Sequence, residues 1–214
     1  PPPSPAPAPL PAVAPRSPPR GTLARARARR APGRRAMPLT QEVIEALDGQ
    51  WSVGMFEAPM QKPLTCFYAA CCPCCAVFQQ REELLELTGE PYVCCAGMFD
   101  CCGMGEPQDK SCLYLEACCC TSWALAGNRF MVQTRFNKEN TPCDDCILWT
   151  VCLLDLAICV ASMFTRVPDE IRLISDCLQI SVFGCMHTQQ QIEIEEIKSK
   201  GYNGMNPRIL QVLP

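Results

Sequence analysis

Residues 66–87, CFYAACCPCCAVFQQREELLEL, place five cysteines within ten positions and then continue as a charged segment rich in helix-forming residues. Such thiols could bind a soft metal ion, form disulfides, accept acyl groups or act as nucleophiles. The chain of 214 residues has 19 cysteines, all between Cys66 and Cys185, and a single histidine. Because 19 is odd, at least one thiol lies outside any intramolecular disulfide. The chemistry is therefore expected in a cysteine-rich centre with cysteine-free ends.

The cysteines are expected to lie in a reducing compartment. The N-terminus is rich in Pro and Arg, without the apolar segment of a secretory signal peptide. The chain also has no Asn-x-Ser/Thr sequon, since Asn140-Thr141-Pro142 lacks the hydroxyl at its third position. In a reducing compartment clustered cysteines bind metal or remain thiols more often than they pair.

Metal binding requires thiolates from separate clusters, because neighbouring residues on a helix point about 100° apart. The strongest pair is Cys143-x-x-Cys146 in TPCDDC, at an expected helix start where the dipole favours thiolate. A Gly-containing loop offers a second set, Cys94/Cys95 with Cys101/Cys102. A thiolate site with little histidine suits zinc, copper(I) or cadmium. The candidate ligands are Cys72, Cys74, Cys94, Cys95, Cys143 and Cys146.

Three other uses of the thiols stay open. Cysteines on helix faces, such as Cys152, Cys159 and Cys177, can act as small buried apolar side chains. Cys71 and Cys75 are candidates for lipidation where they meet a membrane surface. A cysteine nucleophile would need His187 as its base, and no Walker A loop, dinucleotide fingerprint or HExxH motif occurs. The chain is therefore not expected to be an enzyme.

Composition divides the chain into four parts. Residues 1–36 are a low-complexity Pro/Ala/Arg leader with eight arginines and no acid, expected to be disordered and either outside the native start or a transit peptide. Residues 37–60 predict a short helix and a connector, 61–200 the cysteine-rich domain, and 201–214 a tail. The part after residue 36 has 11 Lys and Arg against 22 acids, which argues against nucleic-acid binding by the folded domain.

The pattern of capping residues, helix formers and breakers predicts a mainly α fold with an irregular Cys/Gly loop. Thr40 is the expected N-cap of the first helix and Gly49 follows its end. Residues 51–63 are expected to form a connector and 92–110 the irregular loop. The remaining segments are expected to be helical, namely 74–87, a helix over 111–136 interrupted near Gly127, 147–164 and 168–200.

The last two segments predict an antiparallel helical hairpin. Ile147–Phe164 is 18 residues long, close to the length of about 20 residues that crosses a bilayer. Its ionisable residue, Asp155, would face a polar seam from Arg172, Asp176 and Gln179, which share one face of the following helix. Membrane association is expected, and a soluble bundle with a solvated polar stripe is the alternative.

A set of motifs resembles the placenta-specific 8 family. Cys66-Phe67 followed by Cys72-Pro73-Cys74 is similar to its signature, which has Cys or Leu where Phe67 stands here. The ordered segments QREELLELTGEPYVCCAG, LEACCC, NRFMVQTRF and TPCDDC are similar to a longer plant and algal branch. The resemblance covers roughly residues 60–197 and carries over Cys66, Cys72, Pro73, Cys74 and Cys146.

The resemblance implies a helical protein of the plasma membrane or an internal membrane that is not an enzyme. Family members are linked to zinc and cadmium resistance or to control of cell number, and transport members are expected to form homo-oligomers. The function expected here is binding or transport of a soft divalent metal, with zinc structural or transported. The alternative is a membrane-anchored regulatory protein whose thiols are structural or palmitoylated. Arg129, Arg135 and Lys138 before the apolar segment predict cytosolic termini.

Overall fold

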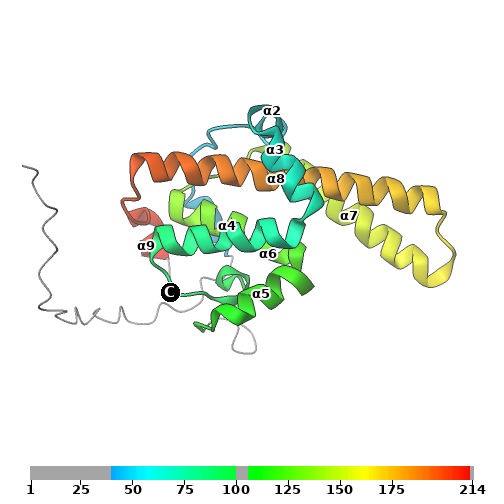
Figure 1. Cartoon of the computed structure of the whole chain (residues 1–214), viewed down its shortest axis with the longest axis horizontal. Coiled ribbons are helices and arrows are strands. Elements are labelled where there is room, and N and C mark those ends of the chain that lie inside the picture. The colour runs from blue at the N-terminus through cyan, green and yellow to red at the C-terminus, as the bar shows by residue number, and fades with distance from the viewer. Residues whose placement is uncertain (1–39, 100–105, 213–214) are drawn as a thin grey trace, which may run out of the picture. The chain divides into compact units, whose positions relative to one another are not determined.

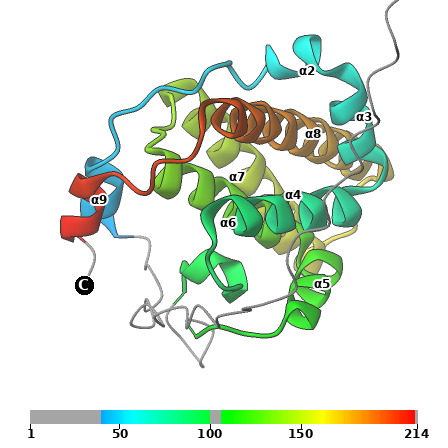
Figure 2. The same cartoon turned by 60° about the vertical axis from the view of Figure 1, so that its left-hand side comes forward.

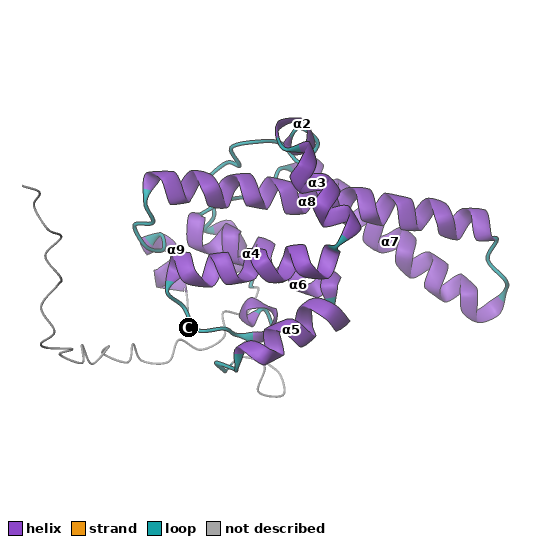
Figure 3. Cartoon of the chain, in the orientation of Figure 1, coloured by secondary structure: helices purple, strands orange, loops and turns teal. Residues whose placement is uncertain are grey.

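The computed structural model describes residues 40–99 and 106–212, which belong to one compact unit, Arg34–Pro214. Helix makes up 75% of these residues, and they contain no strand (Figure 3). The expected leader and Cys101/Cys102 lie outside the described residues. The elements are α1 (Gln41–Glu45), α2 (Ala58–Gln61), α3 (Pro63–Cys71), α4 (Pro73–Thr88), the 3₁₀ turn η1 (Cys94–Gly97), α5 (Lys110–Cys119), α6 (Thr121–Phe136), α7 (Pro142–Phe164), α8 (Asp169–Lys200) and α9 (Pro207–Val212).

The 32-residue helix α8 is the common packing partner of α2, α3, α4, α6 and α7. Its first part lies beside α7, and its later part packs against α2, α3, α4 and α6 (Figures 1 and 2). An apolar cluster around Leu84, Leu113 and Ile194 joins α4, α5 and α8, and reaches α9 through Ile209. A smaller cluster of Val77, Ala124, Leu125 and Met186 lies nearer to α7. Burial of these side chains drives the packing of the body.

Arg129 is the centre of a buried polar layer between α6, α7 and α8. Its guanidinium donates to Gln189 (2.8 Å) on α8 and forms an ion pair with Asp144 (3.1 Å) in the first turn of α7. It also donates to Asn140 at 2.7 and 3.0 Å, and lies 4.5 Å from the centre of the Trp51 ring. Burial lowers the pKa of Arg129 to about 10, and Asp144 opposes the shift. Arg129 is therefore charged at neutral pH and has polar partners.

The helix boundaries predicted from the sequence are confirmed in part. Thr40 caps α1, accepting a hydrogen bond from the Val43 amide, but α1 ends at Glu45 and not just before Gly49. Helix α4 ends at Gly89 with φ of 68°. Helix α7 begins earlier than the predicted Ile147, since Thr141 accepts from the Asp144 amide at 3.1 Å and Pro142 follows at the first helical position. These local interactions satisfy amides that the helix itself leaves unpaired.

The interruption predicted near Gly127 is wrong. The break between α5 and α6 falls at Cys120 (φ −131°, ψ 45°), whereas Gly127 is buried within a continuous helix. A Cβ at Gly127 would lie 2.4 Å from Nη2 of Arg81 and 3.2 Å from the carbonyl carbon of Cys95. The glycine thus permits close approach of η1 and Arg81 to α6.

The connector predicted over 51–63 is also only partly right. It contains the short helix α2, and a further helix, α3, begins at Pro63. Pro59 and Pro63 stand at the first positions of these helices, where a missing amide hydrogen costs nothing.

Helix α7 presents most of its apolar surface outward. It has 23 residues, a length of about 34 Å. It is the one helix in the described part of the chain that is long and apolar enough to cross a membrane, and none of its most apolar window is buried. Polar contacts join it to α8, with Gln179 donating to Asp155 (2.8 Å) and Arg172 to Ser162 (3.1 Å). Asp176 is exposed.

Replacing Asp144 with Ala tests the buried layer. Loss of this partner leaves Arg129 charged and short of an acceptor, so the free energy of unfolding is expected to fall by about 3–5 kcal/mol. The control is Asp145→Ala, one residue further along α7, because Asp145 is exposed and contacts Asn140 at the surface. The control should cost no more than about 1 kcal/mol. Denaturant unfolding measures both, and equal losses would contradict a special role for Asp144.

Candidate metal centre

The candidate centre is built on a turn of unusual backbone conformation. Cys95 (φ 49°), Ala96 (φ 55°) and Gly97 (φ 77°) are consecutive left-handed residues in η1. Residues other than glycine rarely adopt this conformation, and it costs on the order of 1–3 kcal/mol each. Strain of this kind persists only where the surrounding structure imposes it, and it is concentrated at functional sites.

The turn is held from three sides. An antiparallel bridge pairs Val93 with Pro107, and the Gln108 amide donates to the Tyr92 carbonyl at 2.9 Å. Helix α6 packs closely against the turn at Gly127, where a Cβ would lie 3.2 Å from the carbonyl carbon of Cys95. On the third side, Glu116 of α5 accepts a hydrogen bond from the Cys95 amide at 3.0 Å.

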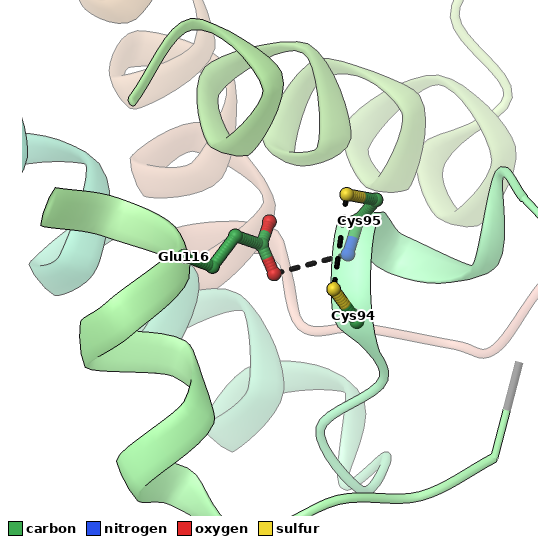
Figure 4. Close-up of side chains that lie close together, drawn as sticks. All are labelled: Cys94, Cys95 and Glu116. Atoms are coloured by element: carbon green, nitrogen blue, oxygen red, sulfur yellow. Dashed lines mark hydrogen bonds between the residues drawn. The ribbon is translucent and has the colours of Figure 1, made fainter. Parts of the chain in front are cut away.

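The left-handed turn brings two adjacent sulfurs to the same side (Figure 4). The Sγ atoms of Cys94 and Cys95 lie 3.8 Å apart. Two thiolates bound to one tetrahedral zinc at about 2.3 Å would be separated by about 3.8 Å. A carboxylate oxygen of Glu116 lies within 4.8 Å of both sulfurs. The three side chains therefore have the donor types and the spacing of a partial zinc or cadmium site.

Glu116 is also the hydrogen-bonding centre of this region. One carboxylate oxygen accepts from the Tyr92 hydroxyl (2.6 Å) and the Cys95 amide (3.0 Å). The other faces Arg81, whose Nη2 lies 3.5 Å away. Arg81 is fully buried and also donates to Asn128 and to the Ala124 carbonyl. Glu116 thus has a fixed position before any metal ion binds.

The net charge of the candidate centre, counted together with Arg81, is zero both with and without a divalent ion. With both thiols protonated, Glu116 and Arg81 neutralise each other. A divalent ion that displaces two thiol protons adds two positive charges and creates two negative ones. Electroneutrality matters here because an uncompensated charge in a buried site is costly. Arg81 is therefore compatible with a metal ion bound by two thiolates and a carboxylate.

Both thiols hold their protons more tightly than an exposed cysteine. Burial, and then the charge of Glu116, raise the pKa of Cys95 to about 12. The same two causes raise the pKa of Cys94. In the metal-free protein both side chains are therefore neutral thiols at physiological pH, and metal binding must release their protons.

The other predicted ligands are not gathered around this site. Cys72 is exposed and Cys74 half-buried, on either side of Pro73 at the junction of α3 and α4. Cys143 and Cys146 lie exposed in the first turns of α7, at the helix start expected for them. Within residues 40–99 and 106–212, the one group of three metal-binding side chains is Cys94, Cys95 and Glu116.

The remaining cysteines of interest lie along α3 and α4. Cys71 and Cys75 are both exposed. On α3, Leu64 and Phe67 are exposed three or four residues apart on the face that ends at Cys71. Cys66 lies against Gly184 of α8, where a Cβ would be 3.0 Å from its sulfur.

His187, the one histidine of the chain, is buried on α8. Its Nε2 lies 3.2 Å from the Ala76 carbonyl. Burial lowers the pKa of its imidazole, so it is neutral at physiological pH.

Sequence reasoning named Cys94 and Cys95 but missed Glu116. This residue is separated from Cys95 by 21 positions, and it follows a stretch of chain with no regular pattern. The sequence does hold one indication, an acidic residue among apolar ones in KSCLYLEACC. An acid on a buried helix face needs a partner, because an unpaired charge is excluded from the interior.

The chain matches no protein-family model, no curated protein and no solved structure in the comparisons made. The resemblance to the placenta-specific 8 family therefore stays a prediction from the quoted motifs.

The raised thiol pKa values predict that any zinc binding at Cys94 and Cys95 depends strongly on pH. Each zinc ion should displace two protons, so its apparent affinity should rise about a hundredfold per pH unit between about pH 6 and 8. Competition with a chromophoric chelator at several pH values measures the slope. For Cys94→Ser one proton is displaced and the rise should fall to about tenfold.

The control for this measurement is Cys119→Ser, at an exposed cysteine on α5 outside the centre. It should keep the steep dependence of the native chain. A native affinity that does not change with pH would contradict binding through two protonated thiols.

Proposed function

We propose that the protein is a membrane-associated, cysteine-rich protein that binds a soft divalent metal ion, zinc or cadmium, at Cys94, Cys95 and Glu116. The observation that carries the proposal is the 3.8 Å separation of the two sulfurs, produced by a strained left-handed turn beside a buried carboxylate. A structural role alone would not require adjacent non-glycine residues in this conformation.

Three protein ligands leave a coordination position for water or for an incoming ligand. Structural zinc sites usually have four protein ligands, whereas sites that exchange a ligand keep one position open. This favours an ion that is taken up and passed on, as in transport or in resistance to metal excess. The motif resemblance to the placenta-specific 8 family supports the same function.

Membrane association is proposed through α7 together with the first part of α8. A helix of 23 residues with outward apolar side chains matches a hydrocarbon layer about 30 Å thick. We propose that these two helices form an antiparallel hairpin whose polar seam includes the Gln179–Asp155 hydrogen bond. The body and both termini would then lie on the cytosolic side of the plasma membrane or of an internal membrane. Homo-oligomers are proposed from the resemblance alone.

A second candidate function is a membrane-anchored regulatory protein. It is favoured by Cys71, which ends an exposed face of α3 that includes Leu64 and Phe67. Such a face suits S-acylation at a membrane surface, with Cys75 as a further acceptor. In this case the thiols would anchor or pack the protein, and a metal ion would be absent or structural.

Metal analysis of the purified full chain tests the proposed site. About one zinc ion per chain is expected, and Cys94→Ser with Cys95→Ser should remove it. The matched control is Cys143→Ser with Cys146→Ser, which changes two exposed cysteines of the α7 start and should retain the metal.

The opposite pattern, with metal lost only from the Cys143/Cys146 variant, would move the site to α7. A native chain without metal, carrying hydroxylamine-sensitive acyl groups on Cys71 or Cys75, would favour the regulatory function instead.

Charges placed on α7 test membrane association. Leu153 and Leu156 are both exposed on α7. Their replacement with Lys should cost about 2.5–3.5 kcal/mol each on insertion near the bilayer centre. The native full chain is expected in the membrane pellet after alkaline carbonate extraction, and the double variant largely in the supernatant.

The control carries the same charges elsewhere, as Leu115→Lys on α5 with Leu210→Lys on α9, which are also exposed. It should remain in the pellet. Extraction of the native chain itself would remove the membrane part of the proposal.

A further inference from the structure

A groove lies where α7 and α8 leave the body of the protein. It has a volume of about 480 Å³ and is lined by the end of α3, the start of α6 and the facing sides of α7 and α8. We call it the root groove and define it by Ala70, Ala126, Leu148, Cys152, Ile180 and Phe183. Its size falls within the range of about 300–1,000 Å³ typical of sites for small ligands.

We propose that the root groove binds one acyl chain of a membrane phospholipid. The inference rests on the membrane association of α7 and α8 proposed above. The lining side chains are mainly apolar, and small ones such as Ala70 and Ala126 leave a narrow channel between the helices. An acyl chain is slender and apolar, whereas a helix with its side chains is about 10 Å across.

The position of the groove explains why the occupant is a lipid. Ile180 of the lining is also exposed on α8, and the exposed Leu153 and Leu156 directly follow the lining residues Cys152 and Asp155 on α7. Trp123 on the groove wall is exposed at the start of α6. Exposed tryptophans favour the boundary between hydrocarbon and headgroups. A lipid in contact with α7 therefore has an apolar entry to the groove at Ile180.

The polar residues of the lining do not oppose an apolar occupant. Asp155 and Gln179 both line the groove and satisfy each other through a hydrogen bond of 2.8 Å. A hydrogen-bonded pair costs much less beside hydrocarbon than two unpaired groups. The pair lies on the side of the groove nearer to the turn between α7 and α8, whereas α3 and α6 close the opposite side.

Photocrosslinking tests the proposal in the full chain. The protein is reconstituted in phosphatidylcholine vesicles that contain some phosphatidylcholine with a diazirine near the end of one acyl chain. After irradiation, peptide mass spectrometry maps the adducts. Adducts are expected both on outward α7 residues, Leu156 and Met163, and on the half-buried groove residues Ala126 and Phe183.

A second arm uses the native chain after solubilisation in detergent before irradiation. A lipid held in the groove should be retained, so adducts at Ala126 and Phe183 should persist while those at Leu156 and Met163 disappear. Loss of both sets together would overturn a specific site.

Variants that fill the groove supply the third arm. Ala70→Phe with Ala126→Phe occupies the channel, so adducts at Phe183 should fall at least about fivefold while those at Leu156 remain. The matched control, Ala157→Phe, adds the same ring on an exposed position of α7 outside the groove and should change neither set.

The outcomes separate the two proposals. Adducts on α7 with none at Ala126 or Phe183 overturn the groove alone. The absence of all adducts overturns membrane association and the groove with it. Groove adducts that form only after hydroxylamine treatment would show that an acyl group on one of the chain's own cysteines fills the groove of the untreated protein, which overturns a phospholipid as its native occupant.

Discussion

The buried guanidinium of Arg129 is the interaction on which the arrangement of the helices depends. It stands on α6, pairs with Asp144 at the start of α7 and donates to Gln189 in the middle of α8. A charge buried to this extent requires all of its partners, because an unpaired one would cost several kcal/mol. The first turn of α7 is therefore fixed to the body by a directional contact, although most of the apolar surface of α7 faces outward. An apolar helix attached in this way can project from the body with a defined orientation.

The second buried cation, Arg81, has a different role. It compensates Glu116, whose carboxylate also accepts from the Tyr92 hydroxyl and the Cys95 amide. Without this compensation, Glu116 would be an unpaired buried charge beside two neutral thiols, which is costly. Arg81 thus balances the charge of the carboxylate that lies beside Cys94 and Cys95.

The parts of the structure that sequence could predict are those set by neighbouring residues. Thr40 acts within one helical turn, so its capping role could be inferred from type and position. Gly89 at the end of α4 and Thr141 at the start of α7 act in the same local way. The role of Gly127 could not be inferred from neighbouring residues, because it depends on the close approach of Arg81 and η1 in the folded chain.

The candidate site was accessible only in part for the same reason. Cys94 and Cys95 were visible as metal-binding residue types. The close approach of their sulfurs, however, depends on a left-handed backbone at Cys95 and Ala96. Neither position is a glycine, so the residue types do not predict this conformation. Glu116 lies at the site because α5 packs beside the turn, and this packing cannot be read from the spacing of residues along the chain.

Helix α6 links the two buried cations, Arg81 and Arg129, and through them the turn η1 and the start of α7. Gly127 contacts η1 and Arg81, and Arg129, two residues later, contacts the start of α7. Residues two positions apart lie about 200° apart around a helix, so Gly127 and Arg129 face nearly opposite sides of α6. The turn that holds Cys94 and Cys95 and the base of α7 therefore both pack against this one helix.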